Sequence, residues 1–213
     1  MKTVKGPLKV DCIYRRLDDN FLDPKAFNKD SVIGVPGLFK CWLKKNVGII
    51  NAVGTGVADD KVVYSYVNRM IVYYLGEQPI LNQVETYLCN DDSQKKYVLE
   101  NLSKLVVKPA NASGGYGIMI GPKASSKERA EVADKIKKNP REYIAQPLET
   151  LSTAPTITEK NIEPRHLDLR PFVLSGKTNY VTTGGLTRVA LRRGSTIVNS
   201  SQGGGSKDTL IVE

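Results

Sequence analysis

A lysine beside a run of glycines is the feature of this sequence that most directly suggests chemistry. Residues 105–121 read as a short apolar strand ending near Lys108, a loop that contains Gly114, Gly115 and Gly117, and a second apolar strand. Glycines let backbone N–H groups approach a ligand closely, and a lysine ammonium adds a point charge. The stretch therefore suits an anionic ligand. It is typical of a flap over nucleotide phosphates, and an ordinary hairpin with a flexible turn is the alternative.

Two better-known phosphate loops do not fit the sequence. No Gly-Lys-Ser/Thr opens a helix after the glycines, which argues against a Walker loop. The run Gly54-Thr55-Gly56 stands between an apolar run and a predicted helix, but the third glycine of a dinucleotide fingerprint is missing. Asp59 and Asp60 suit that helix start as caps, where a pyrophosphate would need bare N–H groups. Lys61 in the same turn is unfavourable unless an anion lies nearby.

Composition and charge favour a globular protein with anionic partners. The net charge of the 213 residues is +9, spread along the chain, and few aromatic residues accompany the basic ones. This pattern favours nucleotides and acidic substrates over nucleic acid, whose binders stack aromatic side chains on bases. No apolar run approaches the roughly 20 residues needed to span a bilayer, so we expect no membrane association. Three dispersed cysteines predict reduced thiols and a cytoplasmic protein.

The elements that must position these side chains fall into two regions. Residues 1–104 read as α/β, and the predicted elements are a strand at 10–16, a helix at 36–45, a strand at 47–53 and helices at 58–75 and 91–102. Residues 105–213 read as α+β, and the predicted elements are the strand–loop–strand, a helix at 125–137, a strand at 142–146 and an antiparallel sheet from 166 onward, with a strand at 196–199. By composition alone the glycine-rich residues 200–208 look like a linker. We expect the two regions to pack together.

Several motifs, in one order, resemble the circularly permuted ATP-grasp family and are similar to the glutathionylspermidine synthase-like ATP-grasp ligases. The runs that carry the resemblance are 56–61, 73–77, 107–117, 143–146, 165–172, 185–189 and 198–208. The resemblance covers the chain from about residue 10 to its last residue. It implies an ATP-grasp-like fold, with an α/β pre-ATP-grasp-like region over 1–104 and the nucleotide-binding region over 105–213. It also makes the glycine-rich tail a family motif.

The resemblance implies ATP-dependent ligation of a carboxylate to an amine through an acyl phosphate. Such chemistry depends on cations placed around a triphosphate. The residues that match the family's nucleotide-binding positions are Lys61 and Lys108 for the α- and β-phosphates, Gly114, Gly115 and Gly117 for the flap, and Gln146 on the strand that meets adenine. The residues that match its catalytic and substrate-side positions are Arg170 and Arg188, which would brace the γ-phosphate or the acyl phosphate, and Asn199, Gly203, Gly204 and Gly205. Surface arginines and a structural loop are the alternative roles of this second set.

The sequence departs from the family in two places. Pro147 follows Gln146 where many members carry an acid that binds the nucleotide, which leaves Glu149 as the candidate substitute. The family also needs Mg²⁺, held by acidic residues and an asparagine that bridge the phosphates. In the permuted family these ligands lie before residue 1, and the candidates that remain by default are Glu159, Glu163, Asp168 and Asp208.

We therefore predict no metal site within this chain and interpret it as the ATP-binding part of a ligase, incomplete by itself. A separate N-terminal half would supply the metal ligands. One alternative is a module that binds nucleotide or a partner without catalysis. A second alternative, a basic nucleic-acid-binding protein, has only the net charge in its favour.

Overall fold

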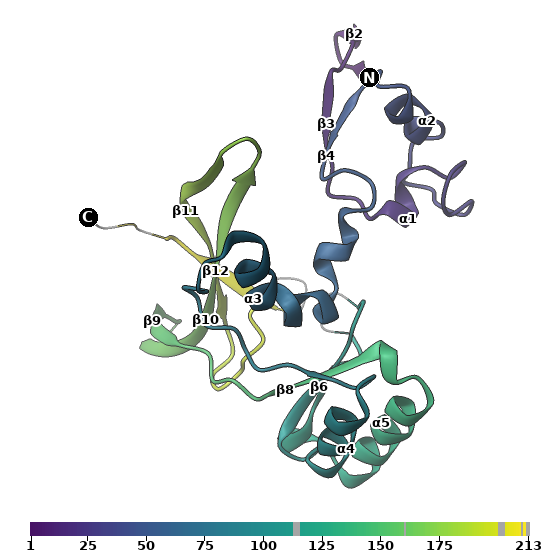
Figure 1. Cartoon of the computed structure of the whole chain (residues 1–213). Coiled ribbons are helices and arrows are strands. Elements are labelled where there is room, and N and C mark those ends of the chain that lie inside the picture. The colour runs from purple at the N-terminus through teal and green to yellow at the C-terminus, as the bar shows by residue number, and fades with distance from the viewer. Residues whose placement is uncertain (113–115, 160, 200–202, 210, 212–213) are drawn as a thin grey trace.

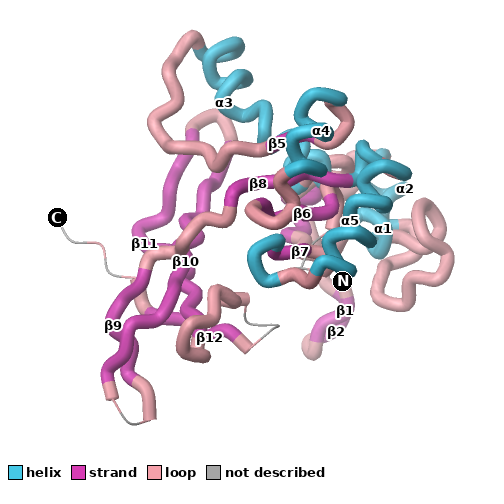
Figure 2. Tube along the Cα trace, turned by 90° about the horizontal axis from the view of Figure 1, so that it is seen from below, coloured by secondary structure: helices cyan, strands magenta, loops and turns pink. Residues whose placement is uncertain are grey.

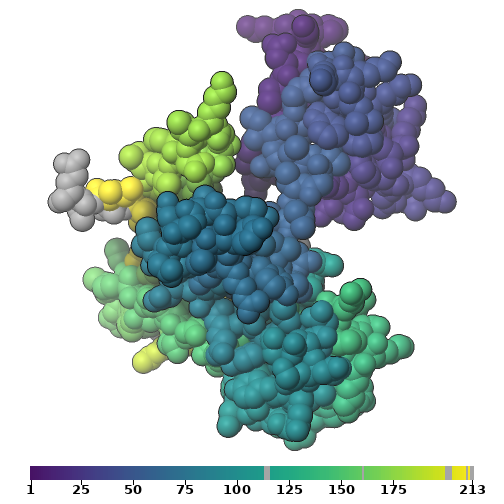
Figure 3. Space-filling model, viewed as in Figure 1, coloured from purple at the N-terminus to yellow at the C-terminus, as the bar shows by residue number. Residues whose placement is uncertain are grey.

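The computed structural model describes residues 1–112, 116–159, 161–199, 203–209 and 211. Its strands form separate sheets joined by helices and loops, as Figure 1 and the rotated view in Figure 2 show. In the space-filling view, the N-terminal residues stand out as a lobe of their own (Figure 3). A mixture of helices with antiparallel sheets confirms the predicted fold class.

The N-terminal residues form a small α/β unit. Its elements are the antiparallel pair β1 (Lys2–Thr3) and β2 (Gly6–Pro7), the parallel pair β3 (Cys12–Tyr14) and β4 (Gly48–Ile50), and, between these two, α1 (Asp19–Leu22) and α2 (Leu38–Leu43). Parallel neighbours need a crossover connection, and the two short helices provide it. The predicted helix at 36–45 and strand at 47–53 are therefore confirmed in shortened form.

A buried carboxylate holds this crossover together. Asp23 is 1% exposed, and its oxygens accept backbone N–H groups of Lys25 at 2.9 Å and of Gly37 and Phe39 at 3.0 Å. Burial by itself raises the pKa of Asp23, but these N–H groups together lower it below the ordinary value of 3.8. The ionised carboxylate thus links the end of α1 to the start of α2.

Acid is expected to destabilise the N-terminal unit partly through Asp23. A carboxylate whose pKa is lowered by folding stabilises the protein fully above its unfolded pKa, and this contribution is lost as the pH falls through the folded value. For the wild type, the free energy of unfolding, measured in urea between pH 2 and 7, should decrease as the pH is lowered past about 4. For Asp23→Asn, the free energy of unfolding should be lower at pH 7 and should decrease less steeply as the pH is lowered. The exposed Asp30 provides the control, and an Asp30→Asn profile identical to that of Asp23→Asn would contradict the assignment.

A single long helix leads out of this unit. The short 3₁₀ helix η1 (Thr55–Asp59) precedes α3 (Lys61–Leu75), and the side chain of Asp60 caps α3 by accepting the Val62 N–H at 2.7 Å. Gly76 ends the helix with a φ of 67°. The predicted helix and the capping role of Asp60 are confirmed.

The first four-stranded sheet, called the flap sheet below, carries the predicted flap. Its strands, in spatial order, are β5 (Tyr87–Leu88), β8 (Tyr143–Pro147), β6 (Leu105–Pro109) and β7 (Met119–Ile120). Its helices are α4 (Asp92–Glu100) and α5 (Ser126–Lys138), with the 3₁₀ turns η2 (Gly121–Lys123) and η3 (Pro140–Glu142) on either side of α5. Both bonds of the capping box between Ser125 and Glu128 are present, as the sequence predicts.

The two faces of this sheet have different roles. Helices α4 and α5 cover one face, as Figure 1 shows. The core beneath them comprises Cys89, Val98, Leu102, Leu105, Val107, Met119, Ile136 and Ala145, so it draws on residues from both sides of position 104. Because side chains alternate along a strand, Lys108 and Gln146 lie on the opposite face.

The other four-stranded sheet, which follows the two strand pairs of the N-terminal unit and the flap sheet and is called the third sheet below, is antiparallel. Its strands, in spatial order, are β12 (Gly204–Lys207), β11 (Asn179–Ala190), β10 (Ile162–Ser175) and β9 (Thr153–Ile157). The hairpin turn after Ser175 is as expected, since Ser175 pairs with Asn179. Among the described residues no helix is long and apolar enough to cross a membrane.

The sequence prediction was wrong about the edge of this sheet. Residues 196–199 form no strand, and β12 from the glycine-rich tail pairs with β11 instead. After β11 the chain turns away from the sheet, in a turn where Ser195 N–H donates to the Arg192 carbonyl at 3.1 Å. The Ile197 N–H donates to the Ser195 side chain and not to a neighbouring strand. The linker that composition alone suggests is therefore not what the described residues 203–208 form, because Gly204–Lys207 are strand β12.

Candidate functional site

The flap is a real strand–loop–strand. Strand β6 pairs antiparallel with β7, with Val106 opposite Ile120 and Val107 opposite Met119. Gly114 and Gly115 lie outside the described residues. Gly117 has a φ of +70°, and a Cβ there would come within 2.9 Å of Pro109 Cγ. A glycine therefore suits position 117, where a side chain would be strained by the positive φ and would crowd Pro109 at the end of β6.

The structure brings Lys61 and Lys108 to the same end of the flap. Lys61 is the first residue of α3, and its backbone N–H donates to the carbonyl of Ala110 at 3.2 Å. Its ammonium donates to the carbonyls of Ala112 at 2.5 Å and Ala110 at 3.3 Å. These bonds tie the helix N-terminus to the base of the flap, two and four residues after Lys108.

The two lysines make this end of the flap electropositive. Burial lowers the pKa of Lys108, and the neighbouring positive charge of Lys61 lowers it further. None of the ion pairs formed among the described residues includes either lysine. An anion bound here would meet two ammonium groups whose charge no carboxylate of the described part neutralises.

Gln146 fixes the direction of Lys108. The Lys108 ammonium donates to Gln146 Oε1 at 2.6 Å, and Gln146 Nε2 donates to Thr86 Oγ1 at 2.8 Å. Gln146 is 8% exposed, so both ends of its amide are engaged inside the protein. Sequence reasoning missed Thr86, because it lies 60 residues before Gln146 and belongs to no motif.

The two predicted catalytic arginines share one face of the third sheet. Arg188 lies opposite Asp168, and Arg170 lies opposite Leu186, two positions further along the same ladder. Arg188 Nε donates to Asp168 Oδ1 at 2.8 Å, and a second contact joins Nη2 to Oδ2. This bidentate bond raises the pKa of Arg188. Arg170 is exposed.

The glycines of the tail lie where the backbone passes very close to its neighbours. Gly203 has a φ of +87°, and Gly204 N–H donates to the carbonyl of Asn199 at 2.9 Å. A Cβ on Gly204 would lie 2.2 Å from the Val198 carbonyl oxygen, and one on Gly205 would lie 2.9 Å from the Leu191 side chain. The glycines thus allow the tail to add β12 to the sheet, and Asn199 stands at the start of that return.

Replacing Gly204 with alanine is expected to detach β12 from β11. The added methyl group cannot fit 2.2 Å from a backbone oxygen, so we expect a loss of about 1–3 kcal/mol of stability. Hydrogen exchange of the β11 amides should show this as faster exchange at the edge facing β12. Gly176 is the matched control, since the nearest atom to a Cβ there is 3.8 Å away. Equal exchange in both alanine variants would contradict the prediction.

The lysines and the arginines stand on different elements. Lys61 begins α3 and Lys108 lies on β6 of the flap sheet, whereas Arg170 on β10 and Arg188 on β11 belong to the third sheet; Figure 2 shows these elements. Within the described ranges, no hydrogen bond or ion pair joins one set to the other.

The carboxylates that remained as metal candidates do not form a site for Mg²⁺. Glu163 is paired with Arg165 at 2.6 Å, and Asp168 is paired with Arg188. Glu159 and Asp208 are exposed, as is Glu149, the candidate substitute for the acid after the adenine-side strand. In the part of the chain that the structure describes, no group of three or more His, Cys, Asp or Glu could hold a metal ion. This donor set does not fit the Mg²⁺ that the resemblance implies.

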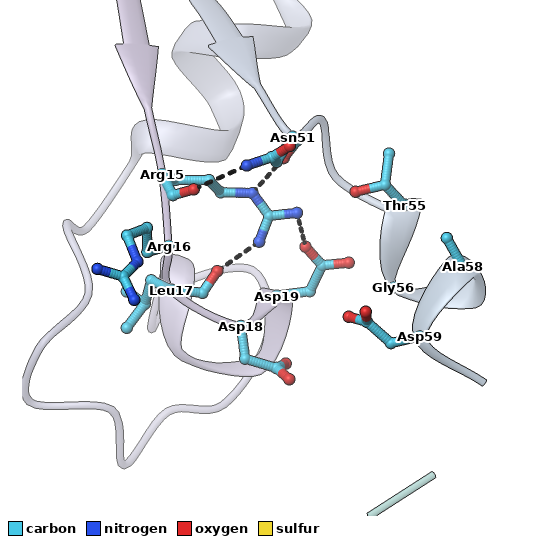
Figure 4. A pocket seen from close by; sticks show the side chains of 10 residues that line it. All are labelled: Arg15, Arg16, Leu17, Asp18, Asp19, Asn51, Thr55, Gly56, Ala58 and Asp59. Carbon is cyan, nitrogen blue, oxygen red and sulfur yellow. Dashed lines mark hydrogen bonds and ion pairs between the residues drawn. The ribbon is translucent and has the colours of Figure 1, made fainter. Parts of the chain in front are cut away.

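A separate cleft of about 560 Å³ lies in the N-terminal unit. Figure 4 shows Arg15 reaching from the end of β3 toward Asn51, Leu17 and Asp19. Its guanidinium donates to the carbonyls of Asn51, Leu17 and Ala52, and it pairs with Asp19 at 2.5 Å. Asp19 also accepts the Gly54 N–H at 2.8 Å. All of these contacts hold the unit together.

Comparisons with known proteins place the chain in a family. Residues 1–190 match the family model described as circularly permuted ATP-grasp type 2. Over its whole length, the chain is 56% identical to an uncharacterized protein of Synechocystis sp. and 53% identical to one of Mycobacterium tuberculosis. Over 95% of its length, it is 50% identical to a Frankia casuarinae protein named "Putative glutamate--cysteine ligase 2-2". The chain spans 44%, 39% and 23% of these relatives, respectively. With a family model matched over most of its length, this chain belongs to the circularly permuted ATP-grasp type 2 family.

Proposed function

We propose that this chain is the ATP-binding part of an ATP-grasp ligase that joins a carboxylate to an amine. The observation that carries the proposal is the convergence of Lys61 and Lys108 at the base of the flap. Two ammonium groups without carboxylate partners in the described part of the chain offer a place for a polyphosphate. The ligase name of the Frankia relative supports the reaction class.

In this proposal, the two lysines hold the α- and β-phosphates of ATP. Lys61 has three N–H donors and uses two of them on the flap carbonyls, which leaves one for a phosphate oxygen. Lys108 is directed by Gln146, and a bound anion would favour its charged form against the effects of burial and of Lys61. The flap glycines, Gly114, Gly115 and Gly117, would cover the β- and γ-phosphates with backbone N–H groups.

Arg170 and Arg188 would act on the transferred phosphate. The substrate carboxylate attacks the γ-phosphorus and ADP leaves, and the amine then attacks the acyl carbon and displaces phosphate with loss of a proton. Both steps gather negative charge on phosphate oxygens, and guanidinium groups neutralise such charge well. Arg188 is already oriented by Asp168, whereas Arg170 is free to reach solvent. The substrate side would be shaped by Asn199 and by Gly203, Gly204 and Gly205 of the tail.

We also propose that the Mg²⁺ ligands come from a segment other than these 213 residues. The carboxylates described here form no metal cluster, and the relatives are more than twice as long as the stretch they share with this chain. That segment would be another part of the same polypeptide or a separate N-terminal half.

Calorimetric titration of the purified chain with ATP, and separately with an oligonucleotide, tests the binding proposal. We expect ATP to bind and the oligonucleotide to bind more weakly. Tight oligonucleotide binding without ATP affinity would reject the nucleotide role. An assay of magnesium-dependent ADP release tests the second part, since robust turnover by this chain alone would reject the need for a further segment.

A further inference from the structure

Three hydrogen bonds run in line from the flap strand to the segment before β5. The Lys108 ammonium donates to Gln146 Oε1 at 2.6 Å, and Gln146 Nε2 donates to Thr86 Oγ1 at 2.8 Å. Thr86 Oγ1 in turn donates to the carbonyl of Val84 at 3.0 Å. The line joins a half-buried lysine to a half-buried threonine through an amide that is only 8% exposed.

Each bond fixes the direction of the next. A lysine ammonium only donates, so the amide atom that faces Lys108 must be the oxygen. The amide nitrogen therefore faces Thr86 and needs an acceptor there. The Thr86 hydroxyl serves as that acceptor, because its own proton goes to the Val84 carbonyl. If the hydroxyl were absent, the buried amide N–H would lose its partner, and the amide could rotate away from Lys108.

The segment that carries Thr86 is itself anchored to α3. The N–H of Val84 donates to the Tyr64 hydroxyl oxygen at 3.0 Å, and the Gln83 side chain donates to the Tyr64 carbonyl. Tyr64 lies three residues after Lys61 on the same helix. Helix α3 therefore sets the place of Lys61 directly and is linked to Lys108 through Tyr64, Val84, Thr86 and Gln146.

We propose that Thr86 is a positioning residue of the phosphate site: through the Gln146 amide it holds the Lys108 ammonium in the orientation that receives the nucleotide. Thr86 makes no contact with the nucleotide in this account. A long lysine side chain loses rotamer freedom when it binds, and a buried amide that has already ordered it reduces that cost. The proposal rests on the proposed nucleotide-binding role of Lys108.

The variants Thr86→Val and Thr86→Ser separate this role from simple packing. Valine keeps the branched shape but removes the acceptor, whereas serine keeps the hydroxyl. For each purified chain, we would measure ATP affinity by calorimetry and titrate Lys108 by NMR of ¹³C-labelled lysine, with Lys108→Met to assign its signal. Thr86→Val should raise the Kd for ATP about fivefold. It should also lower the pKa of Lys108 further, because an oriented carbonyl oxygen favours the charged form. Thr86→Ser should match the wild type in both measurements.

Thr158→Val is the control, because the Thr158 hydroxyl is bonded to the carbonyl of Asn161 in the turn between β9 and β10, away from the flap sheet. It should leave both readouts unchanged. An unchanged Lys108 titration in Thr86→Val would overturn the proposal, as would a serine variant impaired as much as the valine one. The proposal would also be overturned if the wild type bound ATP and Thr86→Val bound it with the same affinity. If the wild type bound no ATP, the proposed function would fail while the Lys108 titration still decided the role of Thr86. If Thr86→Val did not fold, Thr86→Ala would carry the same comparison.

Discussion

Replacing Lys108 with methionine should weaken ATP binding about 10- to 150-fold, which corresponds to the roughly 1.5–3 kcal/mol of a hydrogen bond to a charged group. Methionine keeps the length and apolar stem of lysine but has no ammonium. The loss should be at the upper end of this range because Lys108 is partly buried and already directed by Gln146 at 2.6 Å. Calorimetric titration with ATP measures the effect.

Lys104→Met is the matched control for this experiment. Lys104 is an exposed lysine just before β6, so its replacement removes one positive charge without touching the flap. Equal loss of affinity in both variants would mean that overall charge, and not the site, binds ATP.

Because Lys61 and Lys108 would share one triphosphate, we expect the loss in the double methionine variant to differ from the sum of the single losses. Strictly additive losses would argue against a shared ligand.

Replacing Arg15 with methionine should cost about 3–5 kcal/mol of the free energy of unfolding of the N-terminal unit. Arg15 is 8% exposed, and its guanidinium serves three backbone carbonyls and the carboxylate of Asp19. Without it, the three carbonyls lose their donor and Asp19 loses its counter-charge. We expect the lower end of the range, because the Asp19 side chain is 27% exposed and retains the N–H of Gly54.

Urea denaturation of this variant should be compared with that of Arg16→Met. Arg16 is the next residue and is exposed, so its replacement removes the same charge and should change stability by less than about 0.5 kcal/mol. A destabilised Arg16→Met, or an unchanged Arg15→Met, would show that the Arg15 contacts do not hold the unit together. ATP binding by a folded Arg15→Met should match the wild type if the phosphate site is as proposed, since Arg15 takes no part in it.

Elements set by local signals could be predicted from the sequence. The helix after Ser125 was predictable because the capping box lies within four residues and Asn139-Pro140 ends the pattern. The strand–glycine–strand flap was predictable because apolar runs and glycines mark it directly.

The edge strand of the third sheet was not predictable from local preference. The apolar run 196–199 has the stronger β preference, but the glycines of β12 are the residues that fit against Val198 and Leu191.

Motifs and periodicity, which are local in the chain, were enough to indicate the family, the fold class and the residue types suited to phosphate. The meeting of Lys61 and Lys108 at the flap base, the pairing of Asp168 with Arg188 and the bond from Gln146 to Thr86 became visible only in the folded chain. A hydrogen bond or a charge interaction depends on distances of a few ångströms between side chains, and strand register and helix placement set those distances for residues up to 60 positions apart.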